Sequence, residues 1–118
     1  MSRITISRKS NWETIAFLLI DLVVSSNQRV FYRQKLFNKQ EFDDYVRWLG
    51  LLGHNANSPT PEKTLDATIQ KLRNKGFVDF LEPGEYRLTD KGYEEMLKTK
   101  ESWNQTISEL KEELKLSP

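Results

Sequence analysis

The residues of this chain with the most definite chemistry lie between Thr60 and Lys75, in the segment TPEKTLDATIQKLRNK. Leu65, Ile69 and Leu72 recur there at helical spacing and predict one buried stripe. At about 100° per residue, the opposite face of that helix is a row that we call the outer row. The outer row consists of Lys63, Ala67, Gln70, Lys71 and Asn74.

The outer row contains no carboxylate, whereas Glu62, Asp66 and Arg73 fall on one flank of the helix. Its two amides match the hydrogen-bonding edge of adenine, its lysines attract phosphate, and its alanine tolerates close approach. Thr64 lies at the margin of the row, where a hydroxyl can bind a phosphate. The composition suits a helix that lies in a DNA groove. A solvated helix face without a ligand has the same composition, and both interpretations stay open.

Residue types typical of enzyme sites are sparse. His54 is the only histidine and lies in a polar loop, the chain has no cysteine, and its five glycines are scattered instead of forming a phosphate loop. The pairs Asp43-Asp44 and Glu94-Glu95 are sequence neighbours, so on a helix their carboxylates point about 100° apart. We therefore expect no enzyme activity, no metal site and no cofactor.

The segments around the outer row predict a helix, a hairpin and a second helix. Pro61 suits the first helical position after an N-cap at Thr60, and Lys75-Gly76 is a typical helix end. The short apolar run 77–81 and the stretch 85–89, with Tyr86 and Leu88 on one face, flank the turn dipeptide Pro83-Gly84 and predict two strands. Thr89 can cap a further helix.

The first half of the chain predicts two more helices and a strand. Ser10 and Glu13 form a capping box before a helix that runs to about residue 25 and is apolar nearly all round. The stretch 29–37 reads as an extended third strand for the hairpin. Asn38 and Glu41 begin a helix that ends near residue 52, and a polar connection follows at 53–59.

Two stretches, LRNKGFVDF at 72–80 and YRLTDKG at 86–92, resemble the helix–wing–helix signature of PadR-like and MarR-like winged-helix regulators. They are also similar to the small winged-helix modules with which some restriction enzymes read DNA. The resemblance covers the second half of the fold. It implies an α+β, mostly helical, winged helix-turn-helix fold that inserts helix 61–75 into a major groove. The connection 53–59 is longer than a simple helix-turn-helix allows.

The predicted wing has an acidic tip, Glu82-Pro83-Gly84-Glu85, and carries only Arg87 as a cation for phosphate. A plain structural hairpin is therefore the preferred interpretation of the wing. The N-terminal arm, residues 1–9, is the better second DNA contact because it carries Arg3, Arg8 and Lys9 and no acid. Alternating isoleucines in the arm also fit an edge strand.

The last predicted helix, from about 90 to 116, has a heptad-like seam. The seam consists of Met96, Lys100, Trp103, Ile107, Leu110 and Leu114. A helix of this length is about 40 Å long, so we expect its far end to leave the body and the seam to pack in a homodimer. The alternative is that the helix folds back over the first helix of its own chain.

Length and charge complete the expectation. The chain has 118 residues and a net charge of +1, which fits one compact domain. We divide it into the basic arm 1–9, a winged-helix domain 10–89 and a C-terminal helix 90–118. The apolar run 15–24 is too short to cross a membrane and, with no cysteine, a cytoplasmic setting is expected. Basic residues concentrate at 1–10 and 29–39, either as one basic face or as ordinary solvated side chains.

The function expected from these observations is sequence-specific binding of double-stranded DNA by a homodimeric transcriptional regulator. The alternative is a winged-helix adaptor whose acidic wing and long helix bind another protein in a larger assembly. The near-neutral charge favours the adaptor, and the outer row favours the regulator. A third hypothesis is a DNA-reading module that works with a nuclease or recombinase.

Overall fold

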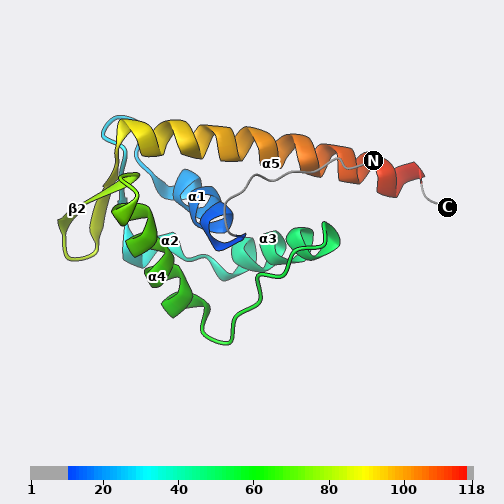
Figure 1. The fold of residues 1–118 in the computed structure, drawn as a ribbon, viewed down its shortest axis with the longest axis horizontal. Coiled ribbons are helices and arrows are strands. Elements are labelled where there is room, and N and C mark those ends of the chain that lie inside the picture. Colours follow the sequence, from blue (N-terminus) through cyan, green and yellow to red (C-terminus); the bar gives the residue numbers. More distant parts are fainter. Residues whose placement is uncertain (1–10, 117–118) are drawn as a thin grey trace.

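The structure is a computed structural model that describes residues 11–116, with the side chains of 115 and 116 outside the description. The elements in chain order are α1 (Asn11–Val23), β1 (Val30–Tyr32), α2 (Arg33–Leu36), α3 (Lys39–Leu51), α4 (Pro61–Asn74), β2 (Val78–Glu82), β3 (Glu85–Leu88) and α5 (Asp90–Leu116). Figure 1 shows a mostly helical α+β chain with one small antiparallel sheet at one end. The expected fold class is confirmed at that level. The predictions for the arm and for Ser10 lie outside the described residues.

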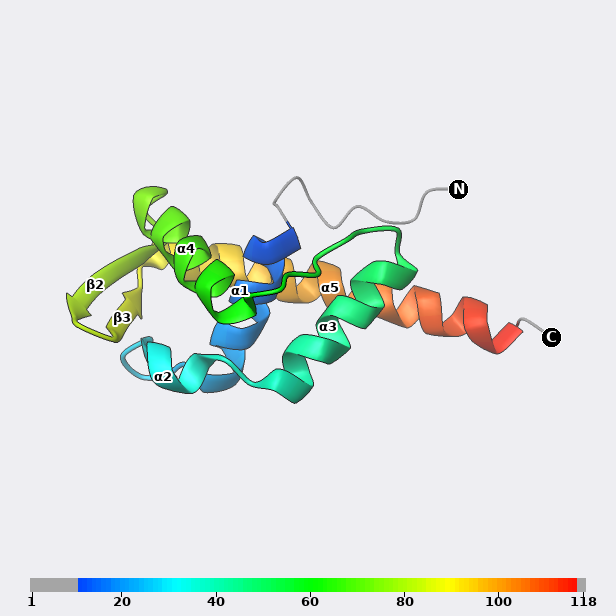
Figure 2. The ribbon, with the colours of Figure 1, turned by 90° about the horizontal axis from the view of Figure 1, so that it is seen from below.

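Helix α1 is the centre of the fold. Every side chain from Glu13 to Ile20 is buried, because α3, α4 and α5 all pack against this helix. Figures 1 and 2 show α5 running along one side of α1 while α3 and α4 lie on the other sides. A helix that is apolar nearly all round has to be covered in this way. The expectation for the first helix is therefore confirmed, with an end at Val23.

The three strands pair in the order β1-β3-β2, so the stretch after α1 does add a third strand to the hairpin. Phe31, Tyr86 and Phe80 lie opposite one another across the three strands and share one face. The rings of Phe31 and Tyr86 stack with centroids 5.6 Å apart, and Phe80 meets Tyr86 edge-on at 5.8 Å. This aromatic row holds the sheet together from side to side.

The extended stretch expected at 29–37 is much shorter in the structure. Only Val30–Tyr32 is strand, and α2 begins at Arg33, which was not predicted. The short helix buries Leu36 in the core and places Arg33 beside Asp66 of α4. Both contacts are with residues distant in sequence, so no local pattern indicates them.

Capping chemistry begins two of the helices as the sequence predicts. The Asn38 side-chain oxygen accepts a hydrogen bond from the Glu41 N–H at 3.1 Å, and the Thr89 hydroxyl accepts one from the Gly92 N–H at 2.9 Å. The prediction that the Thr60 side chain caps α4 is wrong, because that side chain makes no capping bond. The Ser58 hydroxyl accepts the Thr60 N–H instead, at 3.1 Å.

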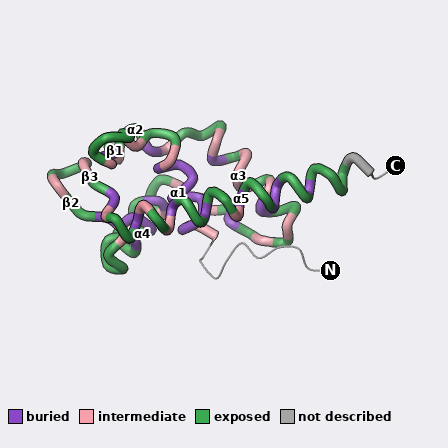
Figure 3. The backbone as a smooth tube through the Cα atoms, turned by 90° about the horizontal axis from the view of Figure 1, so that it is seen from above, coloured by how far each residue is buried: buried purple, intermediate pink, exposed green. Residues whose placement is uncertain are grey.

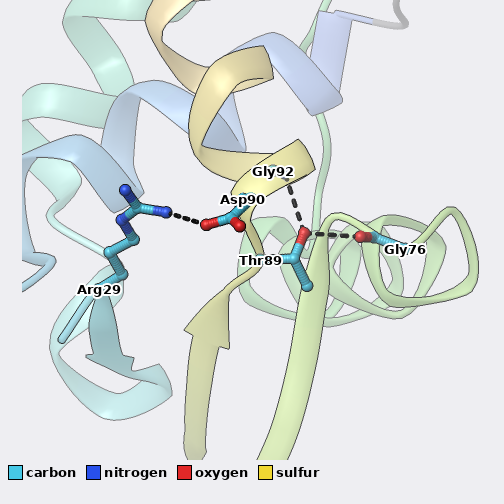
Figure 4. A network of polar contacts seen from close by, with 5 residues as sticks. All are labelled: Arg29, Gly76, Thr89, Asp90 and Gly92. Carbon is cyan, nitrogen blue, oxygen red and sulfur yellow. Dashed lines mark hydrogen bonds and ion pairs between the residues drawn. The ribbon is translucent and has the colours of Figure 1, made fainter.

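One junction joins α4, the hairpin and α5 (Figure 4). Besides capping α5, the Thr89 hydroxyl donates a hydrogen bond to the Gly76 carbonyl at 2.7 Å, and the Thr89 N–H donates to the Phe77 carbonyl. Gly92 faces the Phe77 backbone so closely that a Cβ atom there would lie 1.8 Å from the Phe77 oxygen. The GF and TDKG pieces of the sequence thus form one contact between the start of β2 and the start of α5.

Helix α5 folds back over its own chain, which corrects the preferred expectation that its seam is left for a second subunit. Met96, Trp103 and Ile107 belong to the hydrophobic core of the single chain, and Leu110 is also buried. Lys100 lies at the rim, where its ammonium pairs with Asp21 of α1 at 3.2 Å. Lys100 and Leu114 are the exposed members of the seam, and Figure 3 shows the last turns of α5 extending past the body.

Candidate nucleic-acid interface

The structure places the outer row of α4 on the surface. Lys63, Ala67, Gln70, Lys71 and Asn74 are all exposed. On the opposite face Leu65, Ile69 and Leu72 are at most 1% exposed, where they pack mainly toward α1. The helical geometry predicted for this segment is therefore confirmed, and the five side chains form one continuous solvent-facing stripe.

Thr64 takes a different role from the one expected. Its hydroxyl lies 2.9 Å from the Ser58 hydroxyl and 3.2 Å from the Thr60 carbonyl oxygen, to which it donates. These bonds tie the first turn of α4 to the preceding loop. The Thr64 side chain is only half exposed, and its hydrogen bonds stabilise the start of the helix.

Asp66, a carboxylate on the flank of the outer row, is paired with a cation. Asp66 accepts two hydrogen bonds from the Arg33 guanidinium, at 2.6 and 3.1 Å. This bidentate bond and the charge of Asp66 raise the pKa of Arg33, so the guanidinium stays charged beside the carboxylate. A DNA phosphate that approaches Asp66 therefore meets a neutral pair, whereas Glu62 on the same flank is exposed and has no ion pair among the described residues.

The hairpin lies beside the same part of α4. A shallow hollow between the two is lined by Asp66, Ala67 and Gln70 of the helix and by Gly84 and Tyr86 of the hairpin. Gly84 has a positive φ of 83°, which a tight turn at this position requires. The turn of the hairpin therefore flanks the middle of the outer row.

Arg73, on the flank of α4, is a further candidate contact that the outer row does not include. Its guanidinium carbon lies 4.9 Å from the centre of the Phe80 ring, which is 42% exposed on β2. The contact holds an exposed cation at the end of α4 that faces the hairpin. The alternation of side chains along β2 could have indicated this contact, because Phe80 shares the face of Val78 and that face turns toward α4.

Arg87 is separated from this surface. It alternates with Tyr86 along β3 and therefore projects from the face of the sheet opposite to Phe80 and Arg73. The structure does not bring Arg87 together with the outer row, which corrects its assignment to the same site. Arg3, Arg8 and Lys9 of the arm lie outside the described residues.

The tip of the hairpin is acidic in space as well as in sequence. Glu82 and Glu85 face each other across the hairpin. Desolvation and a hydrogen bond with Glu82 raise the pKa of Glu85, and the charge of Glu82 adds to this shift. Two like charges at the tip repel phosphate, which agrees with a structural role for the hairpin.

The C-terminal end of α4 is anchored to the core helix. The Lys75 ammonium donates a hydrogen bond of 2.6 Å to Glu13, whose side chain is only 5% exposed. Buried carboxylates of this kind need a close cation. The pair fixes the end of α4 to α1, and with it the orientation of the outer row.

Within residues 11–116 no helix is both long and apolar enough to cross a membrane. The same part of the chain brings together no group of three histidine, aspartate or glutamate side chains that could hold a metal ion. Comparison of the chain with protein-family models, with curated proteins and with solved structures finds no match.

Proposed function

We propose that the protein binds double-stranded DNA through α4, with the outer row in a major groove. The observation that carries the proposal is an exposed helix face with two lysines, two amides and no carboxylate, beside an aspartate that Arg33 neutralises. Such a face combines phosphate attraction with groups that can read base edges. Arg73, held on Phe80, adds a further phosphate contact at the end of the helix.

The order of the elements supports a winged-helix interpretation. A first helix, a short strand, further helices and a hairpin whose inner strand pairs with that first strand is the order expected from the family resemblance. The connection between α3 and α4 departs from the simple helix-turn-helix pattern, because a loop of residues 52–60 replaces a short turn. Both helices nevertheless pack on α1. We assign the reading helix to α4 because it flanks the hairpin.

As a regulator, the protein would bind a two-fold symmetric operator as a homodimer, with one α4 in each half-site. Most of the α5 seam is used inside the single chain. Exposed apolar side chains left for a second copy include Leu114 on the projecting end of α5 and Leu22 at the end of α1, each 51% exposed. A cytoplasmic setting belongs to the same proposal.

The second candidate function is that of an adaptor. The paired carboxylates of Glu82 and Glu85 at the wing tip favour it, because they repel nucleic acid and attract a basic protein surface. In this case the hairpin, and no part of α4, would be the contact surface.

Binding of a random-sequence DNA duplex across a salt series tests the proposal. Fluorescence anisotropy should show an affinity that falls as salt rises, and Lys63→Ala and Lys71→Ala should each lower the slope by about 1. Lys98→Ala removes an exposed lysine of α5 and serves as the matched control with an unchanged slope. If the wild type does not bind DNA at low salt, or if the two α4 variants keep the salt slope of the control, the adaptor becomes the better account.

A further inference from the structure

A cleft between α3 and the second half of α5 lies away from α4 and the hairpin. Figure 1 shows α3 and the second half of α5 at the opposite end of the molecule from the sheet, where Tyr45 contacts Trp103. Glu41, Asp44, Tyr45 and Trp48 line the cleft from α3, and Trp103 and Lys111 line it from α5. The function proposed above makes no use of this cleft.

Aromatic rings form the walls of the cleft. Tyr45 meets Trp103 edge-on, with the planes at 90° and the centroids 5.6 Å apart. Trp103 is buried, whereas Tyr45 and Trp48 are each half-buried and present part of their rings to solvent. The faces of tryptophan and tyrosine rings carry partial negative charge and attract cations.

Carboxylates surround the same rings. Burial and the negative charges of Glu41, Asp21 and Asp44 raise the pKa of Tyr45 to about 12. Asp21 is paired with Lys100 and Asp44 with Arg47, each at 3.2 Å. Glu41 makes no ion pair with any residue that the structure describes, so its charge is available at the mouth of the cleft.

A cation of the chain itself already lies on this surface. The Lys111 ammonium is 5.6 Å from the centre of the Trp48 ring. Lys111 is exposed and belongs to the last turns of α5, so it can swing away. The position of the Lys111 ammonium indicates that an external cation would bind over the Trp48 ring and displace Lys111.

We propose that the cleft between α3 and α5 binds an alkylammonium group, with Trp48 and Tyr45 against the cation and Glu41 as its counter-charge. Lys111 competes for the Trp48 face and lowers the affinity. The same chemistry belongs to a small free quaternary ammonium compound and to a methylated lysine side chain of a partner protein. The inference does not depend on DNA binding.

Two-dimensional NMR of the tryptophan indole N–H groups tests the proposal on the full chain. Titration with tetramethylammonium chloride at constant ionic strength should give saturable shifts at Trp48 and Trp103. Trp12 lies against Phe42, outside the cleft lining, and its signal should stay in place. The neutral compound tert-butanol, of similar shape, should shift none of the three.

Variants separate the charge of the site from its shape. Glu41→Gln should weaken binding at least threefold, and Lys111→Met should strengthen it at least twofold. Lys98→Met, another exposed lysine of α5, should leave it unchanged. Equal shifts with tert-butanol, or weaker binding by Lys111→Met, would overturn the proposal.

Two further ligands distinguish the sources of the cation. A short peptide with trimethyllysine that binds at least tenfold more tightly than choline would identify a protein partner. Equal affinities would identify a small free cation. Failure of both ligands to shift Trp48 and Trp103 would overturn the proposal, whatever the outcome of the DNA experiment.

Discussion

Replacement of Gly92 by alanine tests the junction between β2 and α5. Gly92 lies in the first turn of α5, where its N–H bonds to the Thr89 hydroxyl. An added Cβ would lie 1.8 Å from the Phe77 oxygen, 2.7 Å from its carbonyl carbon and 3.0 Å from its Cα. All three atoms are backbone, so no side-chain rotation can relieve the clash.

Two effects of opposite sign decide the magnitude. Alanine favours a helical conformation over glycine by about 1 kcal/mol. Overpacking at a rigid contact costs about 1–3 kcal/mol, and the separation from the Phe77 oxygen indicates the upper end. The net loss in the free energy of unfolding should be about 2 kcal/mol, which for a chain of this size lowers Tm by about 8 °C.

Urea and thermal unfolding followed by circular dichroism measure this change. Gly50→Ala is the matched control, because Gly50 lies in α3 and an added Cβ there meets nothing within 4 Å. That variant should gain up to about 1 kcal/mol. A Gly92→Ala protein as stable as the wild type would refute the close contact of α5 with Phe77.

The remaining predictions concern the outer row, the seam and one tyrosine. Gln70→Ala and Asn74→Ala should change the free energy of unfolding by less than about 0.5 kcal/mol but cost about 1–3 kcal/mol of binding at a preferred DNA site, measured by anisotropy. Trp103→Ala should destabilise the chain by about 3–5 kcal/mol in urea unfolding even at high dilution, whereas Leu114→Ala should be nearly neutral. Because the pKa of Tyr45 rises from 10.0 to about 12 on folding, stability present below pH 10 should be lost as pH rises toward 12, and Tyr45→Phe should lose less over that interval.

Helical periodicity predicted the parts of the fold that depend on neighbouring residues. The stripe of Leu65, Ile69 and Leu72 fixed which face of α4 is buried, and the alternation of Tyr86 and Leu88 fixed the inner face of β3. Caps at Asn38 and Thr89 were also predicted from residues within four positions, whereas the cap predicted at Thr60 in the same way does not form.

Contacts between distant residues were missed or misassigned. The seam of α5 has the same periodicity whether it meets a second subunit or its own α1 and α3, so the packing of Trp103 on Tyr45 could not be chosen from spacing alone. The stretch at 33–36 turns into α2 because Leu36 enters the core and Arg33 reaches Asp66, 33 positions away.

The outer row of the candidate site was predicted correctly as an exposed helix face, but the neighbouring arginines were not placed correctly. The five outer-row residues depended only on the helix to which they belong. Arg73 and Arg87 depended on which face of the sheet turns toward α4, which the sequence does not specify until the hairpin is docked.

The central position of α1 has a consequence for how the chain acquires its structure during synthesis. This helix is synthesised before the other described elements, and α5, which covers one of its sides, is synthesised after them. At roughly 5–20 residues per second, α1 waits several seconds for that cover, with its apolar surface open to chaperones or to other chains. Contacts between such distant segments also slow the final step of folding. Mutations that weaken the packing of α5 on α1 should therefore reduce the yield of soluble protein in cells. The reduction should be larger than for mutations elsewhere that lower the free energy of unfolding of the purified chain by the same amount.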